Sequence, residues 1–201
     1  MKNKVLIILG VVLLIVVVGG VWFYFGKTEN QEINKNQNQE EQAGGNMLVK
    51  DGFSIVLPKG WTESAGTVEG VAALAFDPNE QITDEAAKSI SFASYLSIGQ
   101  DSLQDKSIND YLVYTKQELQ KALGVAEFIN EQSLAINSKE AYSLEMQLNQ
   151  ENINFRVLMV LIAGDNGDVW AVSFNTLESM WNDYKDAFYN SAKSFIVKKL
   201  N

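Results

Sequence analysis

The distribution of hydrophobic and polar residues divides this chain of 201 residues into three zones. Residues 5–25 form an uninterrupted run of 21 residues without a charge, and residues 27–46 are almost entirely polar. From Met47 onward, apolar residues return at regular intervals. We therefore predict an N-terminal transmembrane anchor at residues 1–26, a disordered polar linker at residues 27–46 and one globular domain at residues 47–201.

The apolar run has the length and composition of a membrane-spanning helix. At about 1.5 Å per residue it is about 31 Å long, close to the hydrocarbon thickness of about 30 Å. A cleaved signal peptide is the main alternative, but the run ends in the aromatic residues 22–25, which suit a membrane interface better than a cleavage site. Lys2 and Lys4 precede the run. The positive-inside rule therefore predicts a single-pass protein of the cell membrane, in contact with the bilayer through residues 5–25, with a cytoplasmic N-terminus and an extracytoplasmic domain.

The polar linker is rich in Asn, Gln and Glu, and Ile33 is its one large apolar residue. Such a segment cannot bury enough apolar surface to offset the entropy lost on ordering. We expect a flexible tether with a root-mean-square reach of about 25 Å.

Several segments of the domain alternate between apolar and polar residues, the pattern of a β-strand with one buried face. Residues 153–163 begin with this alternation and then become continuously apolar, which is typical of a central strand covered on both faces. Asn166-Gly167 follows, a dipeptide that strongly favours a tight hairpin. We predict strands at residues 53–57, 71–76, 89–97, 142–148, 153–163 and 169–175.

Two longer segments repeat their apolar residues every three or four positions, as amphipathic helices do. The first begins after Ser107, a good N-cap, and stops at Gly124, whereas the second runs from about Leu177 to Phe195. Residues 82–88 are compatible with one helical turn. Together the elements predict an α+β fold, a three-layer α/β/α sandwich with a central antiparallel sheet, preceded by one transmembrane helix.

The composition excludes several kinds of chemistry. The chain contains no Cys and no His, which excludes disulfides, thiol nucleophiles, lipid-modified cysteines, histidine metal ligands and Ser-His-Asp triads. The formal net charge is -9, and from Lys27 onward 14 basic residues stand against 25 acidic ones. An acidic surface repels phosphate, so we predict no nucleic-acid partner and expect the same repulsion to disfavour direct docking on an anionic membrane.

Four marks occur in a characteristic order along the domain. They are Leu57-Pro58-Lys59-Gly60-Trp61 after the first strand, the helix at 107–123, a small turn with Ala and an aromatic strand within 135–148, and the pair Ser194-Phe195. This order resembles the PsbP-like superfamily, which includes the extrinsic PsbP protein of photosystem II, a Ran-binding import factor and DcrB-type lipoproteins. The resemblance covers about residues 47–199 and implies a three-layer sandwich, but little about activity. Bacterial envelope members look most similar. Ser138 replaces a usual Gly, and the absence of His departs from the metal sites of photosynthetic members.

Few residues suggest a reactive or ligand-binding site. Asp165, Asn166 and Asp168 could bind calcium through oxygen atoms, although a solvated hairpin turn is the simpler interpretation. Arg156, the one arginine, is expected to pair with a carboxylate such as Glu145 on the neighbouring strand, with anion binding as the alternative. Less specific candidates are Asp101, Asp105, Asp183 and Asp186 as surface acids, and Trp61, Trp170 and Trp181 as core residues or the lining of a groove. We predict no catalytic residue, no cofactor and no metal.

These observations favour a membrane-anchored, extracytoplasmic, non-enzymatic interaction or assembly module with an unidentified protein partner. A domain that binds a small ligand or a cation such as calcium is the first alternative. A hydrolase that uses carboxylates, or Ser with Lys, is the second.

Overall fold

The computed structural model describes residues 45–66, 68, 70–124 and 126–198. The expected membrane span at residues 5–25 and nearly all of the linker lie outside these residues. Within them, no helix is both long enough and apolar enough to cross a bilayer.

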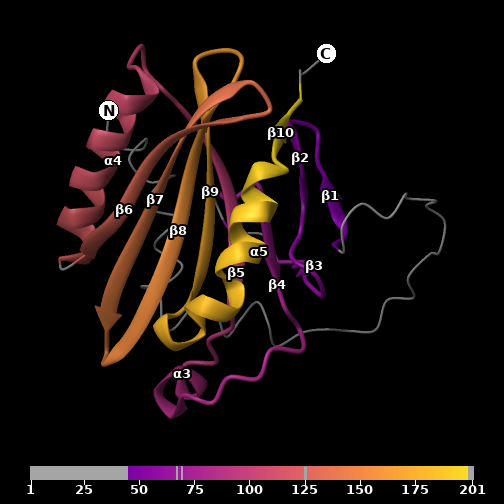
Figure 1. Ribbon diagram of the computed structural model, residues 1–201, viewed down its shortest axis with the longest axis vertical. Coiled ribbons are helices and arrows are strands. Elements are labelled where there is room, and N and C mark those ends of the chain that lie inside the picture. The colour runs from indigo at the N-terminus through magenta and orange to yellow at the C-terminus, as the bar shows by residue number, and fades with distance from the viewer. Residues whose placement is uncertain (1–44, 67, 69, 125, 199–201) are drawn as a thin grey trace.

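A large antiparallel sheet forms the centre of the domain, with strand order β3-β4-β5-β9-β8-β7-β6 (Figure 1). Its strands are β3 (Thr62–Glu63), β4 (Ala73–Phe76), β5 (Tyr95–Ser102), β6 (Ala126–Ile136), β7 (Lys139–Gln150), β8 (Ile153–Ala163) and β9 (Asp168–Leu177). A second, smaller sheet has the order β1-β2-β10 and consists of β1 (Met47–Val49), β2 (Phe53–Val56) and β10 (Ile196–Val197). The last strand thus pairs with the second one, so the two ends of the described chain meet.

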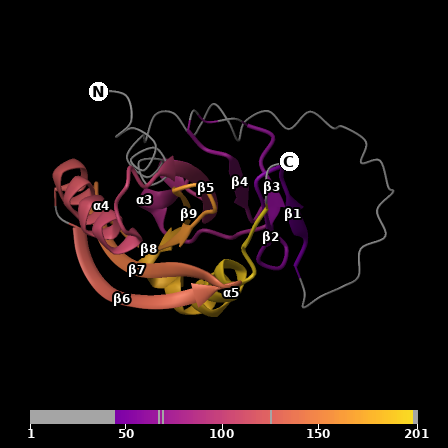
Figure 2. The ribbon, with the colours of Figure 1, turned by 90° about the horizontal axis from the view of Figure 1, so that it is seen from above.

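Helices cover both faces of the large sheet, as Figure 2 shows from above. Helix α4 (Ile108–Leu123) packs on β7 and β8 from one side, and α5 (Trp181–Lys193) packs on β8 and β9 from the other. The short helix α3 (Glu85–Ser89) and the 3-10 turn η1 (Glu178–Met180) complete the helical elements of the described residues. One hydrophobic core lies under α4, and a second lies between the sheet, α5 and the small sheet. The α+β class and the central antiparallel sheet are therefore confirmed.

The central strands β8 and β9 have both faces buried, as the continuous apolar run of residues 157–163 predicts. Val157 and Met159 contribute to the α4-side core, whereas Leu158 and Val160 contribute to the α5-side core. The two strands are joined at the predicted Asn-Gly hairpin, where Gly167 has a φ of 70° that favours glycine.

The helix at 107–123 begins and ends where its sequence predicts. The side chain of Ser107 accepts a hydrogen bond from the Asp110 amide, and Gly124 is the C-cap. The helical spacing predicts one buried stripe of Ile108, Tyr111, Leu112, Thr115, Leu119 and Ala122. The first five are buried, whereas Ala122 is exposed.

Three predicted boundaries are wrong. The strand expected at 89–97 begins only at Tyr95. Ile90 and Phe92 precede this strand and pack against the α4-side core, whereas Leu96 belongs to the α5-side core. The strand expected at 71–76 begins at Ala73. The last helix begins at Trp181 rather than Leu177, because Leu177 still pairs with Phe155 as the end of β9.

Candidate functional site

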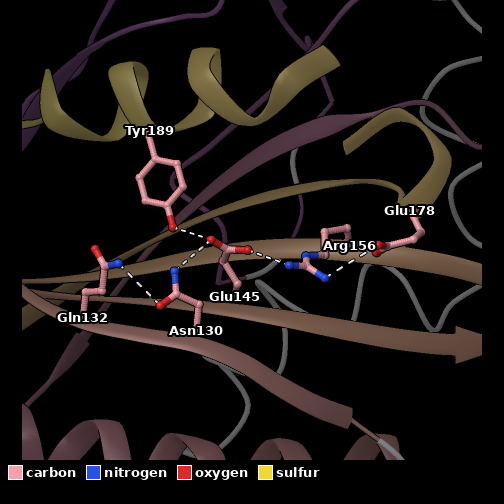
Figure 3. A network of polar contacts seen from close by, with 6 residues as sticks. All are labelled: Asn130, Gln132, Glu145, Arg156, Glu178 and Tyr189. Carbon is pink, nitrogen blue, oxygen red and sulfur yellow. Dashed lines mark hydrogen bonds and ion pairs between the residues drawn. The ribbon is translucent and has the colours of Figure 1, made fainter. Parts of the chain in front are cut away.

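Two groups of polar side chains are associated with the large sheet. The first, which we call the buried charge network, lies on the α5 face and consists of Asn130, Gln132, Glu145, Arg156, Glu178 and Tyr189 (Figure 3). The second, which we call the polar cleft, lies at the β8–β9 hairpin and is lined mainly by Gln100, Asp165, Asn166, Asp168, Trp170 and Lys198.

Glu145 is the centre of the buried charge network. One carboxylate oxygen accepts a hydrogen bond from Arg156 Nη2 at 2.7 Å. The other accepts one from the Tyr189 hydroxyl at 2.7 Å and one from Asn130 Nδ2 at 3.1 Å. Glu145 is only 2% exposed. Both of its oxygens are thus occupied by side chains of this chain, as Figure 3 shows.

The sheet register places these groups together. Asn130 on β6 lies directly opposite Glu145, whereas Arg156 on β8 lies opposite Gln147, so Glu145 and Arg156 meet diagonally. Side chains two positions apart on a strand share a face, which brings all of them to the α5 side. Tyr189 then reaches down from α5. The predicted pairing of Arg156 with Glu145 is confirmed.

Arg156 has further neighbours at the start of α5. Its guanidinium carbon lies 5.0 Å from the centre of the Trp181 ring, a cation–π arrangement, and its Nη1 lies 3.6 Å from a Glu178 oxygen. Nε of Arg156 and Oε2 of Glu178 are buried without a hydrogen-bond partner among the described residues. The cation is therefore held by two carboxylates and one indole.

The network keeps Glu145 ionised. Burial alone raises the pKa of its carboxyl group, but hydrogen bonds from Tyr189, Arg156 and Asn130 together outweigh burial and bring the pKa below its ordinary value. Burial, followed by the hydrogen bond to Glu145, raises the pKa of the Tyr189 hydroxyl, which therefore stays protonated as the donor. An enclosed, ionised and fully bonded carboxylate suits a structural role rather than proton transfer to a substrate.

The polar cleft contains the three residues considered as calcium ligands. Asp165 is ion-paired with Lys139, and Asp168 accepts hydrogen bonds from Gln100 Nε2 at 2.5 Å and from the Asn166 amide at 3.1 Å. These carboxylates thus bind side chains from β7 and β5 and one amide of their own loop. Across the described part of the chain, no group of three acidic side chains gathers closely enough to hold a metal ion.

Trp170 forms the apolar wall of the cleft, whose volume is about 470 Å³. Its ring packs against Phe53 and Phe195 with centroid distances of 5.2 and 5.8 Å, so only its edge reaches the cleft. A Cβ at Gly52 would lie 2.9 Å from the ring, which explains a glycine at this close approach. Trp170 is therefore both a core residue and a lining residue, the two roles considered for it.

The remaining candidates have structural or solvent-exposed positions. Asp101 accepts a hydrogen bond from the Tyr111 hydroxyl at 2.8 Å, whereas Asp105 is exposed. The carboxylates of Asp183 and Asp186 are exposed on α5. The side chains of Trp61 and Trp181 are buried in the α5-side core.

Comparison with known proteins identifies the family. A model of the PsbP family matches residues 49–197, which is most of the chain. The chain belongs to the PsbP family. No curated protein matches it.

Solved structures of PsbP-like proteins share the fold. The cyanobacterial PsbP (CyanoP) of Synechocystis sp. PCC 6803 is 21% identical, with a TM-score of 0.57 over 82% of this chain and 98% of that protein. LpqN of Mycobacterium tuberculosis, described as involved in cell envelope biogenesis, is 12% identical, with a TM-score of 0.56 over 77% and 86%. The Ran-binding protein Mog1p of Saccharomyces cerevisiae is 11% identical, with a TM-score of 0.55 over 77% and 96%.

The marks that resemble the PsbP family have structural roles in this member. Gly60 has a φ of 87° in the turn before Trp61, and the Trp61 ring meets Phe188 edge-on at 5.6 Å. The side chain of Ser194 accepts a hydrogen bond from the Val56 amide at 2.8 Å. Ser138 has a φ of 67°, a backbone conformation that favours glycine. These residues therefore stabilise turns and packing contacts of the fold.

Sequence reasoning missed most members of the buried charge network. Tyr189, Asn130 and Glu178 come from α5, β6 and η1, and their meeting depends on how α5 lies across the sheet. The available signal was a charged residue, Arg156, at the start of a strand that soon becomes apolar. Such a cation needs several partners when it is buried, which predicts partners beyond the neighbouring strand.

Proposed function

We propose that this PsbP-family chain is a non-enzymatic interaction or assembly module, anchored in the cell membrane through residues 5–25 with its domain outside the cytoplasm. The observation that carries the proposal is the match of the PsbP family to nearly all of the described domain. The fold also occurs in a protein described as Ran-binding and in one described as involved in cell envelope biogenesis. Both are roles that a binding domain can perform.

The chemistry of the described domain supports a binding role. The Glu145 carboxylate is enclosed under α5 and has both oxygens engaged. A hydrolytic carboxylate must instead reach a substrate and exchange a proton with it. Glu145 therefore stabilises the sheet on which a partner can dock.

The sequence supports the anchored arrangement. The 21-residue apolar run, the preceding lysines and the polar linker all come before the first strand, which begins at Met47. A tether of about 25 Å would hold the domain near the bilayer and raise its effective concentration toward partners in the same membrane.

Affinity purification of the full chain from detergent-solubilised membranes tests the interaction. We expect a defined protein partner to be recovered with the natural chain in replicate purifications. The Trp61→Ala variant is the control, because it removes a buried core ring and leaves residues 5–25 unchanged. Recovery of the same partner with both chains would assign binding to the anchor, and repeated absence of any partner would contradict the proposal.

A second candidate function is the binding of a small polar or cationic ligand, and the polar cleft favours it. The cleft combines the Asp168 carboxylate, the Gln100 amide and the Trp170 edge in about 470 Å³. A thermal-shift screen of the full chain in detergent with calcium and with small polar compounds tests this function. We expect stabilisation that Asp168→Asn abolishes; no stabilisation by any compound would rule against this candidate.

A further inference from the structure

The small sheet exposes apolar side chains on one face. Among the described residues, five large hydrophobic side chains are strongly exposed, and three of them lie here: Met47 at 45%, Val49 at 50% and Ile196 at 45%. The register aligns Val49 with Ser54 and Ser54 with Ile196, whereas Met47 is opposite Val56. Paired residues point to the same side of a sheet, so these side chains form one surface. We call Met47, Val49, Val56 and Ile196 the outer apolar face.

The opposite side of the small sheet is part of the domain core. Leu48, Phe53 and Ile55 are buried there among the residues of the α5-side core. The small sheet therefore carries apolar side chains on both sides, with Ser54 between Val49 and Ile196 on the outer side, although only the inner side packs in the core of the described domain. Single exposed hydrophobic residues are ordinary, but a cluster on one sheet face is typical of an interaction site.

The charge around the outer apolar face differs from that of the rest of the domain. Residues 46–60 and 194–198, which include the small sheet, contain three lysines and one aspartate. The remainder of residues 45–198 contains 8 basic and 20 acidic residues. Lys59 is exposed just beyond the Met47–Val56 end. At the Val49 end, the Lys198 amine bonds to the Lys50 carbonyl, and Lys50 is ion-paired with Glu63.

The position of this face along the chain, close to the proposed membrane span, favours the lipid surface as its partner. Met47 follows the polar linker directly, and about twenty residues separate it from the apolar run at 5–25. If that run spans the bilayer, as proposed above, the tether holds the outer apolar face within about 25 Å of the lipid on average. Apolar side chains with flanking lysines suit an interface of acyl chains and anionic headgroups. A second copy of the face would bring the same lysines together, which disfavours a dimer.

We propose that the outer apolar face docks the domain on the anionic lipid surface of the membrane in which the chain is anchored. This inference rests on the proposed anchoring. Around the outer apolar face, three lysines stand against Asp51 and the Glu63 that pairs with Lys50, so the acidity that disfavours membrane docking for the molecule as a whole does not extend to this face. Docking would orient the domain, with the polar cleft and α5 at fixed positions relative to the bilayer.

The chain contains no natural cysteine, so a single introduced cysteine can report on this surface. The full chain is reconstituted in vesicles of neutral lipid or of neutral lipid mixed with phosphatidylglycerol, with an environment-sensitive fluorophore at Val49→Cys or Ile196→Cys. Val113→Cys on α4 is the matched control, because Val113 is 48% exposed. We expect a blue shift of the fluorescence emission, and quenching by headgroup spin labels, for the probes at residues 49 and 196. The probe at residue 113 should show neither effect.

Two further variants sharpen the test. Val49→Glu is expected to abolish the shift of the probe at residue 196, whereas Val113→Glu is expected to leave it unchanged. Salt at about 1 M, which shortens the Debye length to about 3 Å, should weaken docking on the anionic vesicles. The use of two probe positions keeps the result interpretable if one substitution disturbs the small sheet.

The outcomes separate this inference from the proposed function. Failure of the chain to float with vesicles would overturn the anchoring and the docking together. Flotation with equal spectra at residues 49, 196 and 113 would overturn the docking alone. A blue shift that increases with the protein-to-lipid ratio, without quenching by the lipid spin labels, would show self-association of the chain. That result would also overturn the docking on lipid.

Discussion

The buried charge network and the polar cleft use similar residues in opposite circumstances. Each combines carboxylates, amides and an aromatic side chain on the large sheet. Glu145 lies in the middle of β7 beneath α5, where its bonds are closed off from solvent. Asp168 lies at the first residue of β9, beside the hairpin, where the cleft is open. Position along a strand, rather than residue type, thus separates an enclosed carboxylate from one that borders an open cleft.

Removing one charge from the network should have the largest effect. Arg156→Met leaves the Glu145 carboxylate buried without its cation, and we expect a loss of about 3–5 kcal/mol in the free energy of unfolding. Urea denaturation of the full chain in detergent, followed by tryptophan fluorescence, measures it. The double variant Glu145→Leu with Arg156→Met should recover most of the loss, because it removes both charges. A single variant as stable as the natural chain would contradict the network.

Tyr189→Phe should have an intermediate effect. It deletes the hydroxyl that donates to Glu145 and keeps the ring, so the cost is that of one hydrogen bond to a charge, about 1.5–3 kcal/mol. The same denaturation experiment measures it. The control is Tyr142→Phe on β7, where we expect a smaller loss of stability. Equal losses would mean that the hydrogen bond from Tyr189 to Glu145 has no special strength.

Acidification should destabilise the folded domain through protonation of Glu145 in the buried charge network. The folded-state pKa of this group lies below its unfolded value of about 4.3, so its ionised form favours folding. This stabilisation is complete above the unfolded pKa and is lost as pH falls through the folded pKa. Unfolding free energies measured from about pH 6 to pH 3 should therefore fall more steeply for the natural chain than for the Glu145→Leu, Arg156→Met double variant. Parallel curves would contradict the assignment.

Substitutions in the polar cleft should have the smallest effect on stability. Lys139→Gln removes a half-exposed ion pair with Asp165, and we expect a loss below about 1 kcal/mol. Thermal melts monitored by circular dichroism would detect a larger change. A loss as large as that of Arg156→Met would mean that the cleft is a structural element like the network.

Local patterns predicted the elements that depend on nearby residues. The cap at Ser107, the stop at Gly124, the Asn-Gly hairpin and the Arg156–Glu145 pair all follow from short spacings, and all are confirmed. Strand β6 was not predicted. A bulge between Phe128 and Asn130 interrupts its period-two alternation, and Asn130 faces the network where an apolar residue would be expected.

The remaining features depend on how distant elements pack together. The contact of Tyr189 with Glu145 requires the position of α5 across the sheet, and the outer apolar face requires β10 to pair with β2. Neither arrangement leaves a periodic signal in the sequence. The family resemblance supplied the fold in advance, but not the contacts that give these residues their roles.

The placement of the domain relative to the membrane is the central claim and can be tested directly. A membrane-impermeant maleimide is applied to intact cells that produce the full chain with a single cysteine, either at Val113 or at Asn3. The account predicts labelling of Val113→Cys in intact cells, and of Asn3→Cys only after permeabilisation, with both chains in the membrane fraction. Labelling in the reverse order, or recovery of the chain in the soluble fraction, would contradict it.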